Sequence, residues 1–170
     1  MENILKKVQI INEESYNQEI KRSTLLLTKS DYVIKYIMST FVFINALLAF
    51  LVTSKIINIW ILVVFYLISG CLLCSCLYLA VKVQILLKGE YFPTGETILN
   101  DIKKDIQSSG EIPNPIRLDR DLIRYYSTYT TKLEEANNER ATILNQSYKF
   151  YLASILFIFS MFFIILIVIA

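Results

Sequence analysis

Residues 149–170 read KFYLASILFIFSMFFIILIVIA, an apolar run that continues to the last residue without a polar residue after it. A membrane-spanning helix needs about 20 consecutive apolar residues to cross the hydrocarbon core. Two other stretches meet this requirement: VIKYIMSTFVFINALLAFLVT at residues 33–53 and INIWILVVFYLISGCLLCSCLYLA at residues 57–80. The three runs predict an all-α integral membrane protein with three transmembrane helices.

The first two spans are separated by only a few residues around Ser54 and Lys55. They are therefore expected to form a tight transmembrane hairpin at 33–80, entered through Ser30 and Asp31 as N-cap residues. The composition agrees, because 55% of the 170 residues are hydrophobic while the chain has only 4 Gly and 3 Pro. The first thirty residues are polar and no cleavage site follows the first span, so we expect this span to be retained.

The basic residues predict the orientation of the spans. Of the 17 Lys and Arg residues, only Lys55 lies in the hairpin turn, and the others lie before or at the mouth of the first span or between the second and the third. Because basic loops stay on the cytoplasmic side, the N-terminus and the 82–149 segment are expected inside. The C-terminal span at 150–170 then places the C-terminus outside and ties the cytoplasmic segment to the membrane at both ends.

The cytoplasmic part is expected to be helical. Residues 1–29 have apolar positions at roughly helical spacing and predict an amphipathic helix. After Gly89 we expect a short helix at 96–108, followed by the connector EIPNPI. Residues 116–170 contain neither Gly nor Pro, which predicts one uninterrupted helix of ~80 Å that runs from about 116 into the third span.

The cytoplasmic part of this long helix carries a repeat in which steps of four and three residues alternate. Heptad spacing of this kind predicts helix–helix association. Two alternatives fit: a seam for oligomerisation or partner binding, and packing against the 96–108 and N-terminal helices of the same chain. Arg140 is a candidate switch, since an unpaired charge on the seam would disfavour one helix register, or it is simply solvated. The seam consists of Leu122, Tyr126, Tyr129, Leu133, Ala136, Arg140 and Ile143.

Small and polar residues inside the first two spans form a second set of candidates. In each span they are spaced four residues apart, which lets helices approach closely. One interpretation is packing within the hairpin, and the other is a subunit interface or the lining of a pore. The set consists of Asn45, Ala49, Thr53, Ser69, Gly70, Cys71, Cys74 and Ser75.

The sequence favours neither an enzyme nor a cofactor or metal site. The chain has no histidine, and its three cysteines lie in the apolar run CLLCSC, where they are expected to pack as small hydrophobes. The acidic residues alternate with Lys and Arg on polar helix faces, and phosphate-loop, nucleophile and zinc motifs are absent from the sequence. A net charge of +2 is too small to predict nucleic-acid binding.

The hairpin at 33–80 and the helical segment at 96–147 resemble the small bacterial membrane effectors of antiphage defence, notably the SLATT-type two-transmembrane effectors. The resemblance implies a homo-oligomeric effector of the bacterial inner membrane, with the lipid bilayer as its target. Such a protein perforates the membrane once a soluble protein or a small molecule triggers its cytoplasmic helices. The third span at 150–170 departs from a two-span plan, because it tethers both ends of the long helix.

Two other functions fit the same layout. One is a non-enzymatic membrane scaffold or accessory subunit, such as an immunity factor, whose cytoplasmic helices dock a soluble partner through Tyr126, Tyr129 or Leu133. The other is a holin-like lysis protein, which would not need the sizeable cytoplasmic segment.

Overall fold

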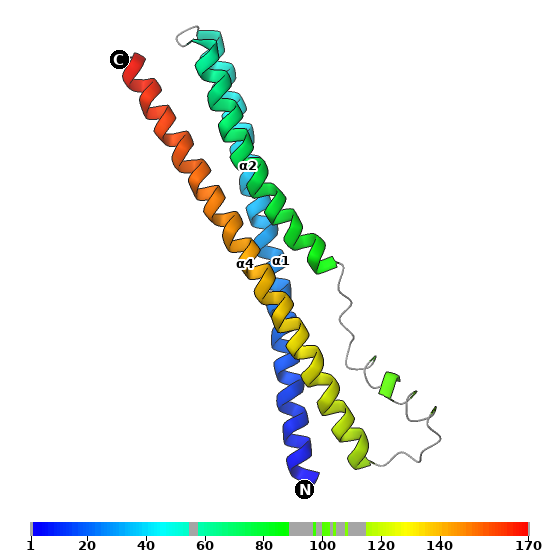
Figure 1. Cartoon of the computed structure of the whole chain (residues 1–170). Helices are drawn as coiled ribbons and strands as arrows, with labels where there is room; N and C mark the ends of the chain where they lie inside the picture. Colours follow the sequence, from blue (N-terminus) through cyan, green and yellow to red (C-terminus); the bar gives the residue numbers. More distant parts are fainter. Residues whose placement is uncertain are drawn as a thin grey trace. The chain divides into compact units, whose positions relative to one another are not determined.

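The structure, a computed structural model, describes residues 2–54, 58–88 and 115–169, together with Thr97, residues 100–102, Lys104 and Ser108. It contains three long helices, α1 (Glu2–Ser54), α2 (Ile59–Lys88) and α4 (Pro115–Ile169) (Figure 1). Apart from Asn58, every described residue is helical. Each long helix includes a segment long and apolar enough to cross a membrane. The predicted all-α fold with three candidate spans is confirmed.

Helix α1 continues through the position where the sequence suggested a helix start. The prediction that Ser30 and Asp31 cap a separate first span is wrong, because both lie inside α1. The Ser30 hydroxyl donates a hydrogen bond of 3.0 Å to the Ala80 carbonyl, and Asp31 accepts one from Gln84. Both side chains therefore form hydrogen bonds with α2 instead of capping α1. In addition, residues 2–54 contain no Gly or Pro that would interrupt the helix.

Helix α2 begins and ends at clear sequence signals. The Asn58 side chain accepts a hydrogen bond of 3.0 Å from the Trp60 backbone N–H, which is the geometry of a helix N-cap. The helix runs beyond the predicted span end at residue 80 and stops at Lys88, directly before Gly89 in the sequence.

Helix α4 is a single helix of 55 residues that starts at Pro115. Proline is favoured in the first helical turn because its missing N–H would have no partner there. The predicted uninterrupted helix is thus confirmed. The predicted 96–108 helix falls largely outside the described residues, and those of its residues that are described are helical.

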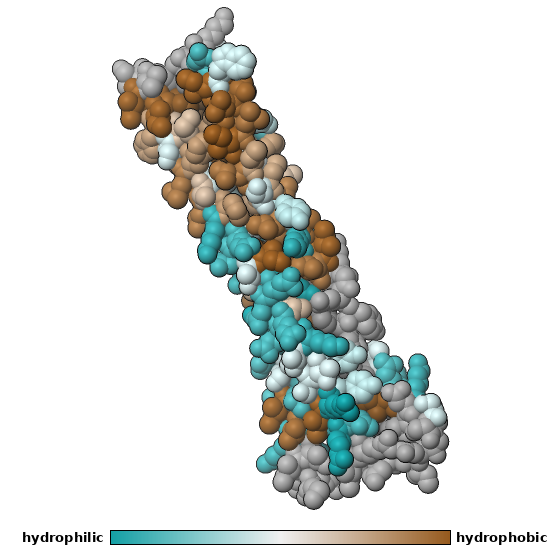
Figure 2. Space-filling model, in the orientation of Figure 1, coloured by the Kyte–Doolittle hydropathy of each residue, from teal (hydrophilic) through white to brown (hydrophobic). Residues whose placement is uncertain are grey.

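The chain divides into two compact units. We call the first the polar unit (Met1–Leu25 and Leu87–Glu139) and the second the apolar unit (Leu26–Leu86 and Arg140–Ala170). On the face shown in Figure 2, the surface of the apolar unit is mostly hydrophobic, whereas hydrophilic side chains cover much of the described surface of the polar unit. Both α1 and α4 contribute residues to each unit.

Buried residues recur every seven positions along each of the three helices. A strict seven-residue repeat is the pattern of helices that pack as left-handed coiled coils. The sequence revealed it only in the polar part of α4. The positions are Tyr16, Ser23, Ser30, Ile37, Ile44 and Leu51 in α1, Leu62, Ser69, Cys76 and Val83 in α2, and Tyr126, Leu133, Arg140, Ser147 and Ser154 in α4.

Candidate functional site

The predicted seam on α4 packs inside its own chain. In the polar unit, Leu122, Tyr126 and Leu133 form a buried cluster with Tyr16 of α1 and with Ile102. The Tyr16 and Tyr126 rings meet edge to face, with centroids 5.7 Å apart. Of the two alternatives, packing against the N-terminal helix and the 96–108 segment is therefore the one observed.

The other seam residues also face inward. Ile143 and Arg140 are buried, and Tyr129 and Ala136 are half-buried. The Tyr129 ring stacks on Tyr125 at a centroid distance of 6.2 Å. In this conformation the chain itself covers the seam face of α4, and oligomerisation or partner binding through the seam stays a prediction.

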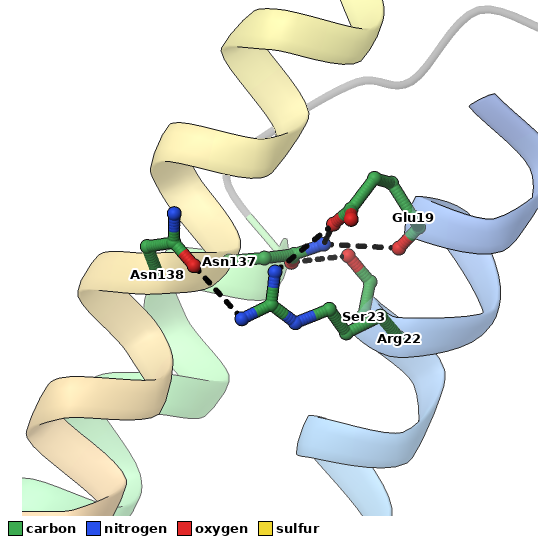
Figure 3. Close-up of polar contacts among 5 residues, drawn as sticks. All are labelled: Glu19, Arg22, Ser23, Asn137 and Asn138. Atoms are coloured by element: carbon green, nitrogen blue, oxygen red, sulfur yellow. Dashed lines mark hydrogen bonds and ion pairs between the residues drawn. The ribbon is translucent and has the colours of Figure 1, made fainter. Parts of the chain in front are cut away.

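A network of polar side chains joins α1 to α4 in the polar unit (Figure 3). We call Glu19, Arg22, Ser23, Asn137 and Asn138 the polar clamp. Asn137 is 0% exposed, and its amide nitrogen donates hydrogen bonds of 2.9 Å to both the backbone carbonyl and the carboxylate of Glu19. Its amide oxygen accepts a bond of 2.6 Å from the Ser23 hydroxyl.

Arg22 closes the network at its exposed side. Its guanidinium donates to the Asn138 amide oxygen at 2.8 Å and lies 3.5 Å from the Glu19 carboxylate. Because both ends of the Asn137 amide are satisfied, the buried network stabilises one alignment of α1 against α4. Sequence reasoning missed Asn137, although its position four residues after the seam residue Leu133 was an available signal.

The Tyr126 hydroxyl predicts a pH dependence of the polar unit. Burial raises the pKa of Tyr126 above its ordinary value of 10.0, and the negative charge of Glu13 raises it further. The folded state therefore favours the neutral phenol, so this contribution to stability is present below pH 10 and is lost as the pH rises through the higher folded-state pKa.

We expect Tyr126→Phe to lose less stability than the native chain between pH 9 and 11, measured by circular dichroism during thermal unfolding. Leu122→Met, in the same cluster, is the matched control and should shift the whole profile without changing its slope. Parallel profiles for Tyr126→Phe and the native chain would contradict the assignment.

Arg140 caps the end of α2 within the apolar unit. It is 1% exposed, and its guanidinium donates a hydrogen bond of 3.0 Å to the carbonyl of Leu86, in the last turn of α2. Carbonyls in the last turn lack partners within the helix, and the C-terminal end of a helix favours a positive charge. Arg140 is therefore buried and hydrogen-bonded rather than solvated, and its role as a switch of helix register stays a prediction.

Further hydrogen bonds between helices lie in one part of the apolar unit, which we call its base (Ser30, Cys76, Ala80 and Ser147). The Ser147 hydroxyl donates to the Cys76 carbonyl at 2.9 Å, and the Cys76 thiol donates to the Ser147 carbonyl at 3.1 Å. The Ser30 hydroxyl bonds to the Ala80 carbonyl in the same region. Cys76 is thus a buried packing residue, whereas Cys71 and Cys74, for which packing was also predicted, are exposed.

The predicted intramembrane candidates lie mostly on the surface of the apolar unit. Six of the eight are exposed: Asn45, Ala49, Thr53, Cys71, Cys74 and Ser75. A Cβ atom added at Gly70 would meet nothing within 4 Å, and only Ser69 is buried. Packing within the hairpin therefore accounts for Ser69 alone, and an interface or pore remains a prediction for the others.

Asn45 is the most polar of these exposed residues. Its amide nitrogen donates a hydrogen bond of 2.8 Å to the Phe41 carbonyl, one turn earlier in the same helix. Thr53 likewise bonds to the Ala49 carbonyl, so this face of α1 directs its polar groups to its own backbone. A single N–H bond leaves most of the hydrogen-bonding capacity of an amide unused.

No protein-family model, curated protein or solved structure matches this chain. The class of protein is defined by the fold alone: an all-helical chain whose three long helices can each cross a membrane.

Proposed function

We propose that the chain is a self-associating, non-enzymatic effector of the bacterial inner membrane that opens a leak when its polar unit is triggered, in the manner of antiphage defence. The N-terminus and the polar unit lie in the cytoplasm and the C-terminus lies outside, because only Lys55 of the basic residues is in the hairpin turn. The trigger is a soluble protein or a small molecule.

The exposed amide of Asn45 is the observation that carries this proposal. It lies in the middle of the first span, on the surface of the apolar unit. An amide that faces lipid loses its hydrogen bonds to water, whereas a neighbouring helix or a water-filled path restores them. Ala49 and Thr53 follow at four-residue spacing and leave room for close approach. A second copy, and water between copies, supply the missing contacts.

The polar unit supplies the control of this leak. Its seam and its polar clamp are satisfied within one chain, which corresponds to a resting state. A ligand shifts such an equilibrium only if it binds the open form more tightly than the closed one. The trigger therefore acts by binding surfaces that the Tyr16–Tyr126 cluster and the clamp now cover.

The test is membrane potential, measured with a voltage-sensitive dye in bacteria that express the full chain. Asn45→Leu and Gly70→Leu are expected to abolish depolarisation while leaving the fold intact, because Asn45 is exposed and the space at Gly70 is open. Val42→Leu, also exposed on α1, is the matched control and should depolarise like the native chain.

A resting chain that needs its trigger will leave the potential unchanged. In that case Asn137→Asp, which breaks the clamp, is expected to depolarise cells without the trigger, and adding Asn45→Leu should cancel this effect. If Asn137→Asp also leaves the potential unchanged at verified membrane levels, the leak is excluded and the scaffold is favoured.

A further inference from the structure

A groove of about 330 Å³ separates α1 from α4 inside the apolar unit. Two of its lining residues, Ser39 and Thr40, carry hydroxyl groups, and the rest are apolar. The lining is Ser39, Thr40, Phe43 and Leu47 of α1 with Ile155, Ile158, Phe159 and Phe162 of α4. We call this the interhelix groove.

The interhelix groove is flanked along the helices by a hydrogen bond on one side and an apolar cluster on the other. At one end the hydroxyls of Thr40 and Tyr151 are hydrogen-bonded at 3.1 Å. At the other end Leu51 and Ile165 belong to one buried cluster with Leu62 of α2. The groove therefore lies along the two continuous helices between a polar contact and a shared apolar cluster.

The Thr40 end of the groove is marked as a membrane interface by aromatic and basic residues. Tyr32 and Tyr36 are exposed on α1 before the groove, and tyrosine is enriched where a bilayer meets water. The Lys35 ammonium lies 5.7 Å from the Tyr32 ring centre. Lys35 precedes Ser39 by four residues and so shares the helix face that lines the groove.

The dimensions fit one acyl chain. Helix α1 rises ~18 Å from Lys35 to Leu47, close to the ~15 Å of half the hydrocarbon core. A helix of a second copy is about 10–12 Å across and would have to separate α1 from α4, which the Thr40–Tyr151 hydrogen bond joins beside the groove. A phospholipid tail is narrow, apolar and present throughout the bilayer.

We infer that the interhelix groove binds one acyl chain of an anionic phospholipid from the cytoplasmic leaflet, with its phosphate at Lys35. The inference rests on the membrane location and orientation proposed above. The bound chain fills the space between α1 and α4 and stabilises the apolar unit in its present packing. The ligand is recognised by an apolar channel with a positive charge at its mouth.

The test is native mass spectrometry of the full chain released from nanodiscs that contain equal amounts of phosphatidylglycerol and phosphatidylcholine. We expect the native chain to retain phosphatidylglycerol preferentially. Ile155→Trp or, from the α1 side, Leu47→Trp fills the groove and should remove the bound lipid. Lys35→Gln should retain lipid without the preference, and Leu152→Trp, exposed on the same helix, should behave like the native chain.

Each other outcome overturns a part of the inference. If the native chain and both groove-filling variants retain the same amount of lipid, the groove is excluded as the lipid-binding site. If the native chain retains both lipids equally, a preference for anionic headgroups is excluded. A lipid-free dimer whose dissociation follows Ile155→Trp identifies a second copy as the occupant. Retained phosphatidylglycerol with an unchanged membrane potential in every variant would leave this inference standing while excluding the leak.

Discussion

Asn137→Asp should lower the free energy of unfolding of the polar unit by about 3–5 kcal/mol, because it places an uncompensated buried charge in the clamp. The new carboxylate would stand where the amide nitrogen now lies 2.9 Å from the Glu19 carboxylate. It also cannot donate to the Glu19 backbone carbonyl, which would lose its partner. Urea unfolding of the purified chain in detergent, followed by circular dichroism, measures the loss.

Two companion variants separate this explanation from general damage to α4. Glu19→Gln combined with Asn137→Asp should recover most of the stability, because the glutamine amide can donate to the new carboxylate. Asn138→Asp, which is exposed and faces Arg22, should leave unfolding unchanged or slightly harder. An equal loss in Asn138→Asp, or no recovery in the double variant, would refute the role of the clamp.

Arg140→Glu should destabilise the apolar unit by about 3–5 kcal/mol, since it buries an anion at the negative end of the α2 dipole. Arg140→Met should cost about 1–3 kcal/mol, because the Leu86 carbonyl loses a donor but no anion is buried in its place. Arg140→Lys keeps the charge and should fall between Met and the native chain. The expected order of stability is therefore Arg, Lys, Met, Glu.

Thermal unfolding of the four proteins in the same detergent checks this order. Amide hydrogen exchange adds a local readout, because faster exchange in the last turn of α2 should follow the same order. If Met and Glu unfold alike, the positive charge does not stabilise the end of α2.

The three helices could be predicted from the sequence because their signals are local. Apolar runs identified the spans, and the lack of Gly and Pro after residue 116 predicted the length of α4. The continuity of α1 could not be predicted in this way. Ser30 and Asp31 are typical N-cap residues, and the groups that they bond instead belong to a helix some 50 residues away in the chain.

The sequence also could not predict which residues inside the spans face the core. In a soluble helix the buried face is apolar and the other is polar, but in a membrane both faces are apolar. Phe43 is 61% exposed and its neighbour Ile44 only 1%, yet both are large hydrophobes. Hydrophobicity alone therefore could not show that Asn45 lies on the surface of the apolar unit.

The sequence did not predict the polar clamp, for a related reason. Asn137 stands among Glu135, Asn138 and Glu139, where a solvated helix face is the ordinary interpretation. Its partner Glu19 is 118 residues away, so only the fold brings the two together. The seam, by contrast, was visible in the heptad spacing, but the same spacing serves packing within a chain or between chains.

The seven-residue repeat of buried positions makes α1 and α4 nearly self-similar along their length. Sliding one helix past the other by a single heptad, ~10 Å, would again place core positions opposite core positions. Apolar packing alone therefore does not distinguish these registers, and the Ser23–Asn137 hydrogen bond, like the Thr40–Tyr151 bond, favours one of them. Without such bonds, α1 and α4 would not loosen gradually. They would shift past each other in steps of one heptad.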